Sequence, residues 1–281
     1  MSANDKTLFL GPSGPLTSGR ITETLAAIGA GDCDWLMIHS EVNFGLPNPE
    51  LSKRELLRGL FESIAALGVK NLLVPTFTFS FCAREDFDVE NSKSPMGAFS
   101  EFFRKMPGAV RSADPMLSVA MIGENTEVLA KIGPESCGKG SIFDILHRAG
   151  NAKMLFLGKT ASSCITHSHY VEVMKGVPYR YPRNFSGFVV SAGRREPKEC
   201  VLHVRCRGAE PYSDNRLDAL ALDCGAGKTA ALGASSATVV DEARIYEAIW
   251  KRLDSDPHFM LSAWPQPPFD ETFDYGPRVS L

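Results

Sequence analysis

Trp35-Leu36-Met37-Ile38-His39 is a short apolar run after the turn Gly31-Asp32, and it opens the segment that decides the fold. Further on, Ser52-x-x-Glu55 forms a capping box, which predicts a helix that continues to Gly68. The run from Leu72 to Phe79 is again apolar and favours a strand. A strand, a capped helix and a second strand form a βαβ unit, which predicts parallel strands with helices on the faces of their sheet.

The same alternation of apolar runs and capped helices continues along the chain. Two strand-like runs near the end, Gly187–Ser191 and Cys200–Arg205, are joined by the polar stretch 193–197 and predict an antiparallel hairpin. We therefore expect an α/β fold, with a mostly parallel central sheet flanked by helices and an antiparallel hairpin in the C-terminal third. The other expected elements are helices at 18–28, 98–105, 124–132, 141–150 and 241–253, and strands at 118–122 and 154–157.

Size and composition bound the organisation of the chain. The 281 residues are near the upper limit for one hydrophobic core, and 44% hydrophobic with 22% charged residues is ordinary for a globular enzyme. Residues 1–17, which include Gly11-Pro12-Ser13-Gly14-Pro15, are expected to form an extended leader. Residues 18–281 are expected to form a single α/β domain, or alternatively two closely packed lobes with the second starting at about residue 185.

Charge and cysteine usage exclude several classes of protein. A formal net charge of -3 gives no basic excess for binding nucleic acid. Seven scattered cysteines without a CxxC pair indicate a reduced, cytoplasmic compartment. No apolar run reaches the length of about 18 residues that a membrane span needs, so neither secretion nor membrane insertion is expected. The stretch Gly225-Ala226-Gly227-Lys228-Thr229 lacks the first glycine of a phosphate-binding loop, because Leu222 stands there, and it is expected to be a turn that leads into a strand.

The densest cluster of reactive side chains extends from Cys164 to Glu172, just after the expected strand that ends near Gly158. If the segment is helical, Thr166, His169 and Glu172 share a face. If it is extended, His167 and His169 share a face and become candidate metal ligands. The first arrangement suits acyl transfer to an amine, because histidine is neutral near pH 7 and a neighbouring carboxylate fixes its tautomer.

Two further loops carry polar groups at the same predicted sheet edge, where the carboxyl ends of parallel strands lie. They follow the first and second strands, at His39–Gly45 and Pro75–Thr78. Their backbone N–H groups and hydroxyls are suited to bind an extended amide chain or an oxyanion. Arg111, Ser112 and Ser118 add a cation and hydroxyls that suit a phosphate or a carboxylate.

Taken together and in this order, these segments resemble the aminoglycoside 3-N-acetyltransferase family, whose fold differs from that of the GNAT acetyltransferases. The resemblance covers roughly residues 18–262. The matching pieces are Ile38-His39-Ser40 with Phe44-Gly45, Val74-Pro75-Thr76-Phe77-Thr78, Ser94-Pro95-Met96-Gly97, Pro107-Gly108-Ala109-Val110-Arg111-Ser112, Pro115 with Ser118-Val119-Ala120, Leu157-Gly158, Thr166 with His169-Tyr170-Val171-Glu172, and Pro178-Tyr179-Arg180.

The resemblance implies an N-acetyltransferase that acetylates a primary amine of an amino sugar with acetyl-CoA as cosubstrate. It implies His169 as the general base, Glu172 behind it and Thr76 near the thioester, with no role for Cys164. The positions that it assigns to coenzyme A are His39, Ser40, Glu41, Val42, Phe44, Gly45, Pro75 and Thr76. Arg111, Ser112 and Ser118 are further candidates for coenzyme A, because of their cation and hydroxyls.

Two departures from the family pattern bear on the ligands. Glu41 replaces a second serine after His39-Ser40, and Asp114 replaces a histidine before Pro115. Acceptor contacts are expected from Glu85, Asp86, Asp88, Asp114, Tyr170 and Tyr179. Aminoglycosides would favour such acidic residues, whereas a nucleotide-linked amino sugar would require the opposite sign near its diphosphate. The expected assembly is a monomer or a homodimer.

Two other functions remain as alternatives. One is a metal-dependent hydrolase that uses Cys164, His167, His169 and Glu172. The other is a sugar-binding relative that keeps the fold without the chemistry.

Overall fold

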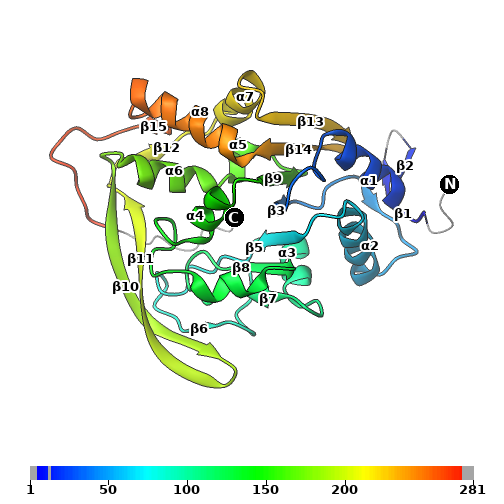
Figure 1. Cartoon of the computed structure of the whole chain (residues 1–281), viewed down its shortest axis with the longest axis horizontal. Coiled ribbons are helices and arrows are strands. Elements are labelled where there is room, and N and C mark those ends of the chain that lie inside the picture. The colour runs from blue at the N-terminus through cyan, green and yellow to red at the C-terminus, as the bar shows by residue number, and fades with distance from the viewer. Residues whose placement is uncertain (1–4, 12–13, 274–281) are drawn as a thin grey trace.

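Figure 1 shows the protein as a computed structural model, in which residues 5–11 and 14–273 are described. Its centre is a seven-stranded sheet with the strand order β13-β14-β9-β3-β5-β8-β7. These strands are β3 (Trp35–Ser40), β5 (Asn71–Pro75), β7 (Val110–Arg111), β8 (Val119–Gly123), β9 (Ala152–Leu157), β13 (Gly227–Leu232) and β14 (Ser235–Asp241).

Parallel pairing is confined to the middle of this sheet. Strand β3 pairs in parallel with both β5 and β9, because helical crossovers connect these strands. On either side the pairings are antiparallel, with β8 beside β5 and β14 beside β9. The α/β class with flanking helices is confirmed, and the expected parallel character holds for the three central strands only.

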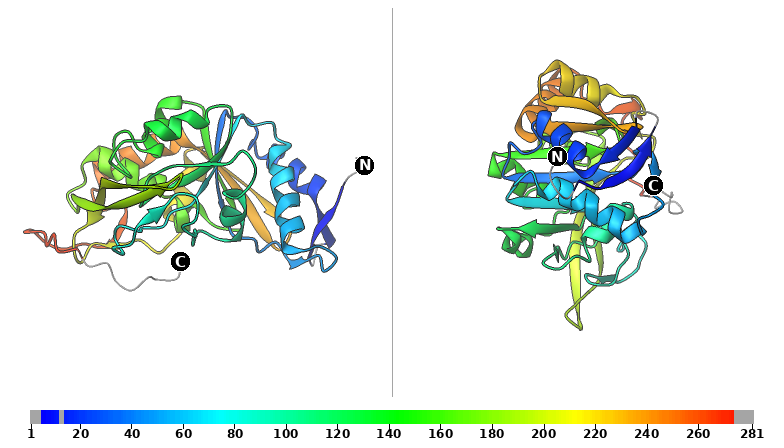
Figure 2. Two further views of the ribbon diagram at one scale, coloured as in Figure 1. Left: turned by 90° about the horizontal axis from the view of Figure 1, so that it is seen from below. Right: turned by 90° about the vertical axis from the view of Figure 1, so that its right-hand side faces the viewer.

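Helices cover both faces of the sheet, so the protein has three layers (Figure 2, left). Alternate residues of each strand face opposite sides. In β3, Leu36 and Ile38 join one hydrophobic core while Met37 joins the other. The first core packs against α1 (Ser18–Ala27), α2 (Lys53–Ala65) and α3 (Ala98–Phe103), and the second against α4 (Ile142–Ala149), α6 (His167–Lys175), α7 (Arg216–Asp223) and α8 (Glu242–Ser255).

The helices begin where their caps predict. Ser52 and Glu55 form the expected reciprocal capping box of α2, and Ser141 and Asp241 cap α4 and α8. The expected helix at 124–132 is instead the 3₁₀ helix η1 (Thr126–Lys131). None of the helices in the described part of the chain is long and apolar enough to span a bilayer.

The expected leader contributes strands within its described residues. β1 (Thr7–Gly11) pairs with β2 (Gly14–Thr17) and with β4 (Leu46–Pro47), and Leu8, Phe9 and Leu16 are buried. Residues 1–4 and 12–13 of this segment, and 274–281 of the expected domain, lie outside the described residues. After residue 185 the chain returns to the central sheet through β13 and β14, so that sheet contains strands from both expected lobes.

A long antiparallel hairpin runs along one side of the molecule from α6 to β6 (Phe87–Asp88), as Figures 1 and 2 show. It consists of β10 (Arg180–Ser191) and β11 (Arg194–Arg205). The hairpin is confirmed, but the expected polar connection at 193–197 is wrong, because residues 194–197 already belong to β11. The turn is Ala192-Gly193, and both residues have the positive φ that a tight hairpin turn requires. The remaining short elements are α5 (Ala161–Cys164), β12 (Glu210–Pro211) and β15 (Leu261–Ala263).

Candidate active site

The expected reactive segment is helical and lies beside the carboxyl ends of the parallel strands. Strand β9 ends at Leu157, and the chain then forms the short helix α5 before α6 begins at His167. Strand β3 pairs with β9 in parallel and ends next to it, with Ser40 opposite Leu157. This edge is where ligands bind in α/β sheets. The helical alternative for residues 164–172 is therefore the one that the structure adopts.

Along α6, His169 and Glu172 lie one helical turn apart and contact each other. Nδ1 of His169 is 2.9 Å from Oε2 of Glu172. Arg180, at the start of β10, donates from Nη2 to the same carboxylate oxygen at 2.7 Å, and that nitrogen is also 2.9 Å from His169 Nδ1. The other carboxylate oxygen, Oε1, accepts the hydroxyl of Tyr179 at 2.7 Å. Helix α6 and the hairpin thus build one charged cluster.

Burial and charge set the ionisation of this cluster. The Glu172 side chain is 2% exposed. Burial by itself would raise the pKa of Glu172, but the Arg180 guanidinium and the hydrogen bond with His169 outweigh it and hold that pKa well below its usual range. Glu172 is consequently ionised at neutral pH. The guanidinium of Arg180, in turn, has a pKa above its usual value because Glu172 outweighs the effect of its burial.

His169 has the properties of a neutral base. Burial and the neighbouring Arg180 lower the pKa of its imidazole, and Glu172 opposes the shift. An ionised carboxylate only accepts hydrogen bonds, so the tautomer that satisfies Glu172 carries the proton on Nδ1. Nε2 then holds the lone pair. The side chain is 38% exposed, and within the described residues Nε2 has no hydrogen-bond partner.

Two polar atoms at the end of β3 are buried and have no hydrogen-bond partner among residues 5–11 and 14–273. They are Nε2 of His39 and Oγ of Ser40, in side chains that are otherwise covered. The ring of His39 stacks on Phe156 with the centroids 5.0 Å apart, and burial lowers the pKa of His39 to about 3. A neutral imidazole and a hydroxyl in such positions are suited to hydrogen-bond a ligand, because an unmet buried polar group is costly.

The side chains at the end of β5 form a closed network. Thr76 is fully buried, and its hydroxyl lies 3.0 Å from Ser118 Oγ and 3.1 Å from Arg111 Nε, which donates to it. Arg111 also donates to the backbone carbonyls of Thr76, Val89 and Ser92. The hydroxyl of Ser112 accepts the backbone N–H of Val119. These groups hold three loops together at the end of the sheet. Pro75, the last residue of β5, pairs with Val119 of β8.

The loop after β3 divides into a surface part and a packed part. Glu41 is exposed and lies 3.9 Å from the Lys159 ammonium. Phe44 is fully buried and packs edge-on against Phe9. Gly45 has φ 138°, and a Cβ there would meet the Leu10 carbonyl oxygen at 2.5 Å. Phe44 and Gly45 therefore fix this loop to the N-terminal strands, as does Val42, which packs against the first core.

The side chains expected at the acceptor are occupied by structural contacts. Asp86 forms an ion pair with Arg195 at 2.7 Å, and Asp88 accepts backbone N–H groups of Glu90 and Asn91 in a turn. Glu85 is exposed at the end of the same loop.

The other expected acceptor residues are buried. Asp114 accepts the N–H groups of Met116 and Leu117, and burial raises its pKa. The hydroxyl of Tyr170 donates to Asp144 of α4, and the hydroxyl of Tyr179 donates to Glu172. The structure therefore brings Tyr179 to the His169 cluster and leaves the acids of residues 85–88 at the distant end of the hairpin.

The two histidines of the metal-hydrolase alternative contact different carboxylates. His167 contacts Glu242 at 2.6 Å, while His169 contacts Glu172 on another side of α6. Within residues 5–11 and 14–273, no group of three histidine, cysteine or acidic side chains is placed to hold a metal ion. Burial raises the pKa of Cys164 to about 11, so its thiol is protonated at neutral pH.

Arg180 and Arg205 are members of the site to which the sequence assigns no role. Arg180 belongs to Pro178-Tyr179-Arg180, one of the segments that resemble the family. The sequence does not indicate that Arg180 contacts Glu172. Arg205 is the last residue of the second expected strand of the hairpin and lies opposite Arg180.

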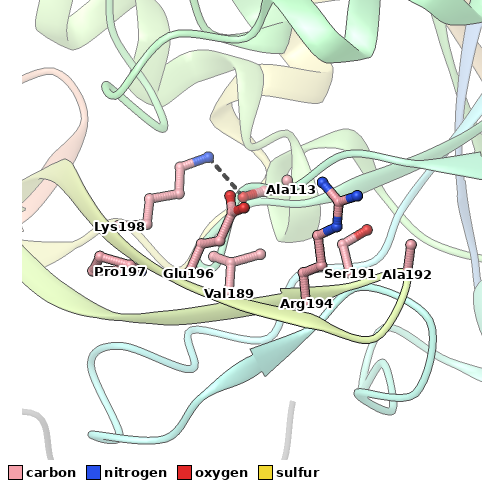
Figure 3. A pocket seen from close by; sticks show the side chains of 8 residues that line it. All are labelled: Ala113, Val189, Ser191, Ala192, Arg194, Glu196, Pro197 and Lys198. Carbon is pink, nitrogen blue, oxygen red and sulfur yellow. Dashed lines mark hydrogen bonds between the residues drawn. The ribbon is translucent and has the colours of Figure 1, made fainter.

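A surface pocket of about 470 Å³ lies at the other end of the hairpin (Figure 3). Its wall includes Arg194, Glu196 and Lys198, and Lys198 donates to the carbonyl of Ala113. At a strand rise of about 3.3 Å per residue, Lys198 lies ~23 Å along β11 from Arg205. This pocket is thus separate from the His169 cluster.

Solved structures share this fold. Aminoglycoside acetyltransferase AAC(3)-Xa is 22% identical, with a TM-score of 0.73 over 86% of this chain and 94% of that chain. AAC-IIIb, solved as a binary complex with CoASH, is 19% identical, with a TM-score of 0.70 over 88% and 98%. The YokD protein from Bacillus subtilis is 18% identical, with a TM-score of 0.67 over 86% and 95%.

Sequence comparison identifies the family. Among curated proteins, no sequence matches this chain. The sequence profile described as aminoglycoside 3-N-acetyltransferase matches residues 50–254, which is more than half of the chain and includes the cluster of His169, Glu172 and Arg180. The protein therefore belongs to the aminoglycoside 3-N-acetyltransferase family, a family of acyltransferases.

Proposed function

We propose that this protein transfers the acetyl group of acetyl-CoA to a primary amine of an amino sugar, with His169 as the general base. The observation that carries the proposal is the pairing of His169 Nδ1 with the buried, ionised Glu172 at 2.9 Å, which leaves Nε2 as a lone-pair acceptor on a partly exposed ring. Membership of the family and the shared fold with AAC-IIIb, which binds CoASH, support acetyl-CoA as the cosubstrate.

The chain's own groups perform the proton transfer. Nε2 of His169 accepts a proton from the amine as its nitrogen bonds to the acetyl carbon, and Glu172 stabilises the resulting imidazolium. Acetyl-CoA supplies the acetyl group, and its carbon–sulfur bond breaks. The imidazolium then returns the proton to the leaving thiolate, so that the products are an N-acetylated amine and a free thiol. This direct transfer needs no cysteine nucleophile, in agreement with the raised pKa of Cys164.

The end of β3 suits the pantetheine arm of the cosubstrate. His39 Nε2 and Ser40 Oγ are buried without partners among the described residues, and they lie at the carboxyl end of β3, next to the end of β9 from which the chain leads through α5 to α6. A neutral imidazole and a hydroxyl can each hydrogen-bond an amide group of an extended chain. His39 and Ser40 are therefore the residues that we assign to this arm, whereas Arg111, Ser112 and Ser118 support the loops around it.

Release of free thiol from acetyl-CoA in the presence of an amine panel tests the proposal. The variant His169→Ala is expected to lower kcat by about 10²–10⁴-fold, because a positioned general base contributes that much. Binding of CoA, measured by calorimetry, is expected to persist. Cys164→Ala is the matched control from the same segment and is expected to keep full turnover. Near-native turnover of His169→Ala would remove this residue from the mechanism, and loss of turnover in Cys164→Ala would instead indicate a cysteine nucleophile.

A further inference from the structure

The hairpin places two arginines directly opposite each other beside the proposed base. Arg180 of β10 pairs with Arg205 of β11 in the antiparallel register. The preceding pair, Tyr179 and Cys206, shares a backbone hydrogen bond of 2.8 Å. Hydrogen-bonded and non-hydrogen-bonded pairs alternate along such a ladder, so Arg180 and Arg205 form a non-hydrogen-bonded pair, whose Cα atoms lie only about 4.5 Å apart. Like charges in this arrangement are destabilising unless something compensates them.

Among the described residues, Arg180 has a compensating partner and Arg205 has none. Arg180 donates to Glu172 and to the carbonyl of His203. The Arg205 side chain forms no hydrogen bond or ion pair with any described residue, although it is partly buried. Glu172 and Glu210 favour its charge, yet burial and Arg180 outweigh them and lower the pKa of Arg205. Glu135, which forms a β-bridge with Val201 of this strand, is 3.4 Å from His203 instead.

A partly buried guanidinium without a partner beside a general base points to an anionic ligand. Guanidinium presents a planar fork of donors that matches carboxylates and phosphates. We infer that Arg205 binds a carboxylate or phosphate group of the acceptor, so that the natural acceptor is an amine that also carries an acidic group. This inference rests on the proposed function, since it places the acceptor amine at His169.

The surroundings favour this acceptor over a polycation. The acids that would attract a polycation, Asp86 and Asp88, are bound to Arg195 and to a turn at the far end of the hairpin. Coenzyme A is a less suitable partner for Arg205. Its thioester must reach the amine at His169, and the pantetheine arm separates the thioester from the phosphates. We therefore assign Arg205 to the acceptor rather than to coenzyme A.

A matched set of acceptors tests the inference with saturating acetyl-CoA. Glucosamine 6-phosphate and muramic acid carry a phosphate and a carboxylate on the glucosamine skeleton, glucosamine carries neither, and kanamycin is a polycation. The wild-type protein is expected to favour the two acidic amines over glucosamine by about 10–100-fold in kcat/KM, as for a charge-assisted hydrogen bond. Arg205→Gln is expected to abolish that preference by lowering kcat/KM for the two acidic amines, with the KM for acetyl-CoA unchanged.

Two further variants separate charge from shape and from general effects on the hairpin. Arg205→Lys keeps the charge but loses the planar fork, so an intermediate preference is expected. Arg194→Gln removes a cation from the far end of the same hairpin and is expected to change nothing. Thermal unfolding verifies that each variant is folded.

Several results would overturn the inference. They are a wild-type preference for kanamycin or glucosamine, an equal loss for all acceptors in Arg205→Gln, and a raised KM for acetyl-CoA with the preference unchanged. If no amine in the panel causes release of thiol, the proposed function fails. Calorimetric binding of glucosamine 6-phosphate and glucosamine then tests whether Arg205 forms an anion site. Tighter binding of glucosamine 6-phosphate than of glucosamine, lost in Arg205→Gln, would support an anion site, and the absence of such binding would overturn it.

Discussion

The ion pair between Arg180 and Glu172 allows a quantitative test of the site's electrostatics. The variant Arg180→Met keeps the aliphatic stem and removes the charge. The two side chains are 7% and 2% exposed and are 2.7 Å apart, so the variant leaves a buried carboxylate without a counter-charge. Removing one partner of a buried pair costs about 3–5 kcal/mol. Because each kcal/mol corresponds to about 2–4 °C in a large domain, we expect the Tm to fall by roughly 10 °C.

The assay is thermal and urea unfolding of the wild-type protein and three variants. Arg180→Met with Glu172→Gln removes both charges and is expected to be more stable than Arg180→Met alone, since no buried charge remains. Arg195→Met is the matched control on the same hairpin. Its pair with Asp86 has the same length of 2.7 Å, but the side chains are 52% and 44% exposed. An exposed pair contributes less than about 1 kcal/mol.

The pH dependence gives an independent check. In the wild-type protein the pKa of Glu172 is lowered, so its contribution to stability is present above the unfolded pKa and is lost as the pH falls through the folded pKa. In Arg180→Met, burial without the guanidinium raises that pKa, so the penalty is present at neutral pH and disappears in acid. The difference in free energy of unfolding between the wild-type protein and Arg180→Met must therefore decrease as the pH falls. A gap that is constant with pH, or a double variant no more stable than Arg180→Met, would refute this reasoning.

Two other predictions concern the ionisation of the base and the network at the end of β5. The ring NMR signals of His169, assigned by difference with His169→Ala, should titrate below the ordinary histidine pKa. Glu172→Gln should lower the pKa of His169 further, because the carboxylate favours the imidazolium. Titration above the ordinary value would contradict the assignment. Thr76→Val should lower the free energy of unfolding by about 1–3 kcal/mol, since Arg111 Nε loses its buried acceptor. Unchanged stability with a lowered kcat would show that the Thr76 hydroxyl acts on the reacting groups instead.

Local sequence signals predicted most of the elements. The capping box at Ser52 and Glu55 and the cap at Ser141 depend on contacts within a few residues, so they can be read without tertiary information. The apolar run at Leu72 was expected to extend to Phe79, but β5 ends at Pro75. Thr76 and Thr78 still donate backbone N–H groups to Ser118 and Met116, and the positive φ of Phe79 ends the extended segment. The pairing directions outside β3, β5 and β9 were not predictable, since they depend on where distant segments meet.

The reactive pair His169 and Glu172 could be predicted because helical spacing alone brings them together. Their surroundings could not. The acids of residues 85–88 were expected at the acceptor from their charge, but Asp86 forms an ion pair with Arg195, about a hundred residues away in sequence. Whether a charge is free or paired is a property of the packed structure.

Short-range geometry and the order of the motifs, both readable from the sequence, establish which residue types stand one helical turn apart, which runs form strands and which family the chain resembles. The contact of Arg180 with Glu172, and the lack of a partner for Arg205 among the described residues, follow from tertiary packing. The physical reason is that the register of the hairpin against α6, rather than any local signal, fixes which charges meet in the interior.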